Sequence, residues 1–99
     1  MSVERRPRRL VLMGIDSEAD AAVVRAAHRS FLAIPGVRCL SAAGSATPVG
    51  EATSPYTHVS VFEFDDADSR TAYHHHPIHT SARDKVRAHV STVLVVDLD

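Results

Sequence analysis

The chain has 99 residues, a formal net charge of −1 and a single cysteine, Cys39. This length fits one domain, the near-zero charge gives no overall field to attract nucleic acid or an anionic membrane, and one cysteine excludes a disulfide framework. No stretch approaches the ~20 apolar residues of a membrane span. The free thiol favours a cytoplasmic location, with Cys39 as a small core residue.

The N-terminal segment is basic. Arginines occupy four of its first nine positions, and these nine residues are expected to form a flexible tail in front of a single domain over residues 10–99. A short run of β-forming residues predicts a first strand over residues 8–15.

An amphipathic helix is predicted next, with Ser17 as its N-cap. Four apolar residues recur at spacings of four, four and three, and they form one stripe: Val23, Ala27, Phe31 and Ile34. Pro35 and Gly36 end this helix. His28 and, later in the chain, His89 are expected on the surface.

Two strands are predicted in the middle of the chain, over residues 37–43 and 56–64. Residues 45–55 between them are rich in Gly, Pro, Ser and Thr, and a loop of this length is a candidate lid over a pocket. The second strand carries apolar side chains on both faces. One face is therefore expected to meet helices and the other a second subunit.

A broken helical region leads to the last strand. Aspartates around residue 66 favour a helix start, the helix over residues 67–75 is interrupted at Pro77, and His76 is biased out of the helical conformation. A second helical piece reaches about residue 89, and a β-branched run predicts a strand over residues 91–98. The order β-α-β-β-α-β is that of a ferredoxin-like α+β fold.

The segment Tyr73-His-His-His-Pro-Ile-His79 concentrates proton-transfer chemistry, because it holds four of the seven histidines. Imidazole titrates near neutral pH, and a phenol can donate a hydrogen bond to a developing oxyanion. Structural interpretations remain open, with His76 and His79 as helix caps and Tyr73 as a core side chain. His74 and His75 are expected in solvent. The histidine spacing fits no standard zinc motif, so no metal is expected.

Three segments resemble the stress-responsive dimeric α/β-barrel (Dabb) family. They are Phe31-Leu-Ala-Ile-Pro-Gly-Val37, Tyr56-Thr-His-Val-Ser-Val-Phe-Glu-Phe64 and Tyr73-His-His-His-Pro-Ile-His79, followed by Val95-Val-Asp97. The pattern Tyr-x-x-His-Pro-x-His is the most specific part of the likeness. The resemblance implies ferredoxin-like units with an antiparallel sheet that pair into a homodimer, in which two sheets close an α/β barrel.

The resemblance also implies site residues. Olivetolic acid cyclases of this family close a linear polyketide by aldol condensation without metal or organic cofactor, and they use a histidine base and a tyrosine. His79 matches that base, and Tyr73 matches that tyrosine. His76 matches the histidine before the proline, and His58 matches a cavity-lining histidine. Phe62 shares the strand face of His58, and these three are expected to contact substrate.

One position departs from the cyclase pattern. Arg9 stands where the cyclase carries a histidine near the start of its first strand. A guanidinium offers a planar fork of donors, which suits a carboxylate or another anion on the substrate. Arg9 is therefore a further expected substrate-binding residue.

The likeness predicts a cofactor-independent cyclase of bacterial secondary metabolism that acts on a small polyketide-like substrate, with neither nucleic acid nor a membrane as partner. The alternative is a non-enzymatic, stress-responsive protein whose dimer or larger oligomer is itself the function. Cofactor-free monooxygenases share this barrel but tend to use Trp and Asn. The chain has neither residue, which disfavours that class.

Overall fold

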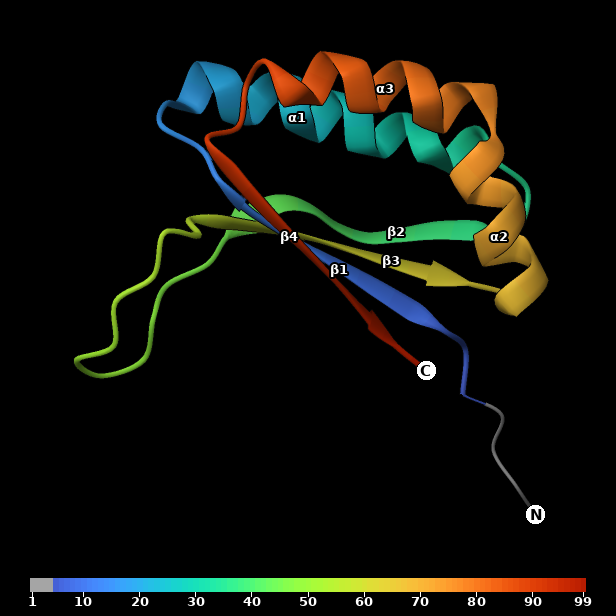
Figure 1. Ribbon diagram of the computed structural model, residues 1–99, viewed down its shortest axis with the longest axis horizontal. Helices are drawn as coiled ribbons and strands as arrows, with labels where there is room; N and C mark the ends of the chain where they lie inside the picture. Colours follow the sequence, from blue (N-terminus) through green and yellow to red (C-terminus); the bar gives the residue numbers. More distant parts are fainter. Residues whose placement is uncertain (1–4) are drawn as a thin grey trace.

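Four antiparallel strands form one sheet, and three α-helices cover one of its faces (Figure 1). The computed structural model describes residues 5–99. Its strands are β1 (Arg8–Gly14), β2 (Val37–Ser45), β3 (His58–Phe64) and β4 (Thr92–Leu98). Its helices are α1 (Glu18–Arg29), α2 (Ala67–His75) and α3 (Pro77–Arg87), with a short 3-10 helix η1 (Ser30–Ala33) after α1.

The strand order is β2-β3-β1-β4, and all three pairings are antiparallel. This is the ferredoxin-like α+β arrangement that the element order predicted. The first and last strands of the chain are neighbours, with Arg9 opposite Asp97. Strand β1 therefore lies in the interior of the sheet, and β4 forms one edge.

Most predicted element ends agree with the structure to within two residues. The boundary of the basic tail was placed too late, because β1 already begins at Arg8 and pairs there with Glu63 and Leu98. Residues 1–4 of the predicted tail lie outside the described residues.

The buried face of α1 differs from the predicted stripe. The buried residues of the helix are Ala21, Val24 and His28, whereas Val23 is 38% exposed. Phe31 and Ile34 are buried as predicted, although they follow the end of α1. The buried residues Ala21, Val24, His28 and Phe31 form a second stripe, with spacings of three, four and three. This stripe was not recognised because His28 was expected on the surface.

Side chains between the helices and the sheet form two clusters. The first is aromatic and consists of Phe31, Ile34, Val37, Phe62, Phe64, Tyr73 and Ala82. The second is aliphatic and consists of Met13, Ile15, Ala21, Val24, Ala43 and Val86. Aromatic residues bury the largest areas of any side chains, so the first cluster dominates the end of the core beneath α2.

The break between α2 and α3 is confirmed at the predicted position. His76 has an extended conformation (ψ 138°), and Pro77 occupies the first turn of α3. Proline fits there because the first helical positions have no intrahelical partner for an N–H group. A ring nitrogen of His76 accepts a hydrogen bond from the Ile78 N–H at 3.1 Å, so His76 caps α3.

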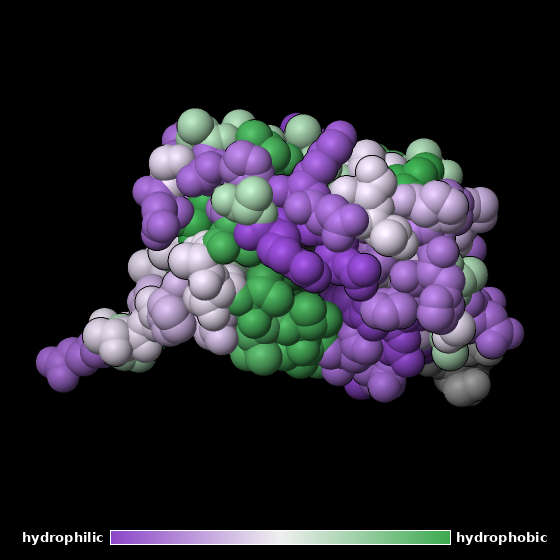
Figure 2. All heavy atoms as spheres, turned by 45° about the horizontal axis from the view of Figure 1, so that its top comes forward, coloured by the Kyte–Doolittle hydropathy of each residue, from purple (hydrophilic) through white to green (hydrophobic). Residues whose placement is uncertain are grey.

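The other face of the sheet carries no helix, and we call it the helix-free face. Side chains alternate along a strand, so the pairings assign to this face an apolar set: Leu10, Leu12, Val59, Val61, Leu94 and Val96. Strand β4 is also exposed toward the helix side, and Figure 2 shows an apolar area over β4 below the polar helix layer. Within residues 5–99, no helix is long and apolar enough to span a membrane.

Candidate active site

Tyr73 and His79 lie side by side in the interior. Their ring centroids are 4.4 Å apart, and the two side chains are 2% and 9% exposed. Tyr73 belongs to α2 and His79 to the first turns of α3. Because the chain changes direction at the break, two residues six positions apart both face the aromatic cluster. The structure thus brings together the two residues predicted to be catalytic.

The hydrogen bonding of His79 determines which ring nitrogen can accept a proton. Its Nδ1 lies 3.1 Å from the carbonyl oxygen of His74. A carbonyl oxygen only accepts, so Nδ1 carries the hydrogen and Nε2 keeps a free lone pair. This carbonyl belongs to the last turn of α2, where carbonyls have no intrahelical partner.

Burial keeps the His79 imidazole neutral. Desolvation is the main cause that lowers its pKa below 6.5, and the bond to His74 opposes the shift. The nearby positive charge of Arg9 acts in the same direction as burial. At neutral pH the residue is therefore an unprotonated base.

Tyr73 is surrounded by aromatic rings. Its centroid lies 5.3 Å from that of Phe31 and 5.1 Å from that of Phe64. Burial raises the pKa of the Tyr73 phenol to about 12, with Arg9 opposing the shift. The hydroxyl therefore stays protonated and can donate a hydrogen bond. The ring of Phe62, a predicted substrate-binding residue, lies 6.2 Å from that of Tyr73.

Arg9 reaches the site from the helix-covered face of β1. Its guanidinium carbon is 5.7 Å from the Tyr73 ring centroid and 6.0 Å from that of Phe64. Two guanidinium nitrogens donate to the Asp97 carboxylate at 2.7 and 3.1 Å. This pair raises the pKa of Arg9 and lowers that of Asp97. Asp97 was not among the predicted site residues, although it lies in the resembling C-terminal segment.

A hollow of about 270 Å³ opens beside these residues. Its lining consists of Arg9, Arg70, Thr71, His74 and His75. The ring of His74 is also 5.5 Å from that of His79. This lining is rich in hydrogen-bond donors, and its two arginines are ion-paired with Asp97 and Asp99. Tyr73 and His79 are not part of the lining.

Two predicted substrate-binding residues are not brought to this site. His76 serves as the cap of α3. His58 begins β3 and lies six positions before Phe64, which is at the site end of that strand; this corresponds to roughly 20 Å of extended chain. The ring of His58 contacts the Thr57 hydroxyl at 2.8 Å instead. The loop over residues 45–55 also projects from that far end of the sheet, so it is not a lid over Tyr73 and His79 (Figure 1).

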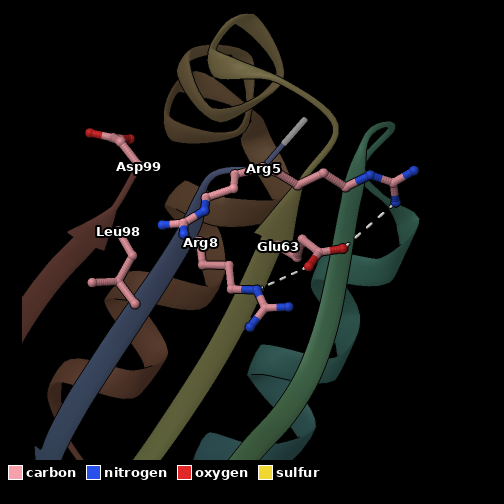
Figure 3. Close-up of a pocket in the computed structure, with 6 residues that line it drawn as sticks. Arg5, Arg8, Glu63, Leu98 and Asp99 are labelled. Atoms are coloured by element: carbon pink, nitrogen blue, oxygen red, sulfur yellow. Dashed lines mark hydrogen bonds and ion pairs between the residues drawn. The ribbon is translucent and has the colours of Figure 1, made fainter. Parts of the chain in front are cut away.

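A second hollow, of about 530 Å³, lies by the helix-free face (Figure 3). Glu63 receives ion pairs there from Arg8 at 3.0 Å and Arg6 at 3.6 Å. Its lining contains no histidine or tyrosine and therefore no group suited to proton transfer at neutral pH. Among the described residues, no group of three or more His, Cys, Asp or Glu side chains is arranged to hold a metal ion.

Sequence reasoning placed two other histidines wrongly. His28 is 5% exposed, and its Nδ1 lies 2.6 Å from the Ser60 hydroxyl. His89 is half-buried and lies 2.8 Å from a carboxylate oxygen of Asp20, which joins the end of α3 to the start of α1. For His28, the spacing from Ala21 and Val24 was the available signal.

The comparisons with known proteins support this fold. A dimeric ferredoxin-like protein of unknown function from Jannaschia sp. CCS1 is similar, with a TM-score of 0.73 and 22% identity over 96% of this chain and 99% of that one. A Dabb family protein with a ferredoxin-like fold from Mesorhizobium loti has a TM-score of 0.72 and 22% identity, covering 95% of each chain.

SnoaB, a cofactor-independent oxygenase from Streptomyces nogalater, is also similar, with a TM-score of 0.69 and 14% identity over 95% of this chain and 91% of that one. Identities this low establish a shared fold only. No curated protein matches the chain. The profile of the family described as the stress responsive A/B barrel domain (Dabb) matches residues 8–99. The chain therefore belongs to the Dabb family.

Proposed function

We propose that the protein is a cofactor-independent cyclase that closes a small poly-β-keto chain by an aldol- or Claisen-type condensation. The observation that carries this proposal is the pairing of a neutral His79, with Nε2 free, and a protonated Tyr73 4.4 Å away. A methylene between two carbonyls is acidic enough for such a base. The similarity to a cofactor-independent oxygenase supports the idea that this fold can work without a cofactor.

In the proposed aldol reaction, Nε2 of His79 removes a proton from the methylene, and the resulting enolate carbon attacks a distant ketone of the same chain. One carbon–carbon bond forms, and the ketone oxygen becomes an alkoxide. The Tyr73 hydroxyl stabilises this oxygen with a hydrogen bond, and the proton on His79 then converts the alkoxide to an alcohol. A positioned base contributes about 10²–10⁴-fold to the rate, and one oxyanion donor about 10²–10³-fold.

Arg9 and the hollow beside it are assigned to the acidic end of the substrate. The side chain of Arg9 is 15% exposed and is held in place by Asp97. Its positive charge lies next to Tyr73, where a carboxylate at the chain end would fix the orientation of the ketones. Phe62 and Phe31 would form the apolar wall that keeps the chain folded.

The test uses a series of synthetic 3,5,7-trioxo acids and esters, with ring closure followed by absorbance and mass spectrometry against the spontaneous rate. We expect His79→Ala to lower the catalysed rate by about 10²–10⁴-fold and Tyr73→Phe by about 10²–10³-fold. His58→Ala, at the end of β3 far from the site, is the matched control and should keep the wild-type rate. Unchanged turnover in His79→Ala, or no acceleration by the wild-type protein for any acid, would refute the proposal.

The second candidate function is that of a stress-responsive protein acting through its homodimer or a larger oligomer. The apolar helix-free face favours it, as do similar structures described as dimeric. A homodimer is compatible with both functions. Only the cyclase requires that loss of His79 changes a reaction rate while the oligomer and circular dichroism stay the same.

A further inference from the structure

The two arginines that line the smaller hollow differ in how firmly they hold their carboxylate partners. Arg9 donates two hydrogen bonds to Asp97, at 2.7 and 3.1 Å, and the two residues lie opposite each other in the pairing of β1 with β4. A ligand could replace Asp97 only by breaking both bonds. The pair between Arg9 and Asp97 is therefore a fixed part of the sheet.

Arg70 of α2 holds its partner less firmly. Its Nη1 lies 2.5 Å from the carboxylate of Asp99 and 3.9 Å from that of Asp97. The side chain of Asp99 is 72% exposed and lies one position beyond the end of β4, whereas that of Arg70 is 21% exposed. Solvent screens an ion pair with so exposed a partner, and such pairs contribute little to stability. Another carboxylate can therefore take the place of Asp99.

Arg70 also lies where a ligand could reach it. Arg70 and His74 both line the hollow of about 270 Å³. Because His74 follows Arg70 by four positions, the two side chains share one face of α2. The ring of His74 is 5.5 Å from that of His79. A single ring thus lies between the hollow and the proposed base.

Asp99 has a second position within its surroundings. It lines the larger hollow as well, together with Arg5 and Arg8, and Figure 3 shows its carboxylate turned away from these two arginines. Within residues 5–99, Arg5 takes part in no ion pair. A carboxylate released from Arg70 would therefore find another guanidinium on this side of β4.

We propose that Arg70 binds the carboxylate of the substrate, and that Asp99 occupies Arg70 in the free protein as a displaceable substitute. This inference rests on the proposed function and narrows its substrate class to free poly-β-keto acids, as opposed to esters or thioesters, whose ends carry no charge. Arg70 is thus a specificity-determining residue. Asp97 stays on Arg9 during this exchange.

The first test measures binding alone. 5-Oxodecanoic acid and its methyl ester serve as probes, because neither has a methylene between two carbonyls and neither is consumed. Calorimetric titration of the wild type should show the acid binding about tenfold more tightly than the ester, since a charge-assisted hydrogen bond is worth at least that factor. This preference should disappear in Arg70→Gln. It should persist in Arg87→Gln, the matched control at an exposed position of α3.

The second test examines the exchange. Asp99→Asn removes the competing carboxylate and should raise the affinity for the acid by about two- to sixfold, the factor expected when an exposed ion pair of ordinary strength is lost. The affinity for the ester should stay the same. Asp84→Asn, which removes a carboxylate from an exposed position of α3, is the control and should change neither affinity.

Three results would overturn the inference: no binding of the acid to the wild type, a preference for the acid that survives in Arg70→Gln, or an unchanged affinity in Asp99→Asn. These failures are distinguishable from failure of the proposed function, because the binding assay does not depend on ring closure. A protein that accelerates ring closure without preferring acids would refute only the role of Arg70. Acid-selective binding without accelerated ring closure would refute only the cyclase.

Discussion

Burial sets the protonation states of the polar side chains in this core. His28 and His79 are both kept neutral by desolvation, and Tyr73 is kept protonated by the same effect. Their tautomers differ because of their hydrogen bonds. The His74 carbonyl accepts from Nδ1 of His79, whereas the Ser60 hydroxyl, which accepts from the Ala43 N–H, donates to Nδ1 of His28. Sequence reasoning found His79 through a motif. It placed His28 on the surface, although the spacing of His28 from Ala21 and Val24 indicated burial.

The titration of His28 should make stability depend on pH. Its pKa is about 4 in the folded protein against an ordinary value of 6.5, so the unfolded chain binds the proton more readily between these values. The stabilisation is complete above pH 6.5 and is lost as pH falls toward 4. Between pH 7 and pH 4.5 the free energy of unfolding should therefore drop by roughly 2 kcal/mol from this group.

Urea denaturation of the wild type and His28→Leu at several pH values measures this contribution. Other groups with lowered pKa values, such as His79 and Asp97, act in the same direction but are common to both proteins. The variant should therefore show a shallower decline. Parallel curves for the two proteins would contradict the assignment of a depressed pKa to His28.

At the scale of elements, the break between α2 and α3 is the feature that builds the site. Pro77 and the residue before it made this break predictable, since proline restricts both its own conformation and that of its neighbour. The approach of Tyr73 to His79 was not predictable from spacing. It depends on the angle between two helices, which the packing of Phe31 and Phe64 determines.

The capping role of His76 gives a prediction for this break. His76→Ala removes the acceptor for the Ile78 N–H and should lower the free energy of unfolding by about 1 kcal/mol, whereas His76→Asn restores a good capping side chain and most of the stability. Thermal or urea unfolding checks the order of the three proteins. Equal stability of the alanine and asparagine variants would show that the cap contributes nothing.

At the scale of the whole molecule, the sheet separates two chemically different sides. The helix-covered side holds the candidate site, and the helix-free face is apolar. Strand periodicity predicted that one face of β3 meets the helices, and the structure shows that this is the face of Phe62 and Phe64. It did not predict that His58, on the same face, lies at the opposite end of the sheet. Membership of a face says nothing about position along a strand.

The helix-free face should mediate homodimer formation. Exposed apolar surface of this extent is typical of an interface, so light scattering coupled to size-exclusion chromatography should give twice the chain mass of 10.7 kDa. Leu94→Asp, at a position 44% exposed on that face, should shift the protein toward the monomer. Val49→Asp, in a loop residue that is 90% exposed, is the control and should remain a dimer. A monomeric wild type, or two variants of equal mass, would contradict this.

The hydrogen bond from His79 to the carbonyl of His74 has one further consequence. That oxygen is available only because the helical hydrogen-bond pattern is interrupted between α2 and α3. A substitution that joined the two into one continuous helix would remove the acceptor on which the imidazole orientation depends. A continuous helix and the observed orientation of the His79 imidazole therefore exclude each other in this segment. Attempts to make the fold more rigid by design should leave this discontinuity untouched.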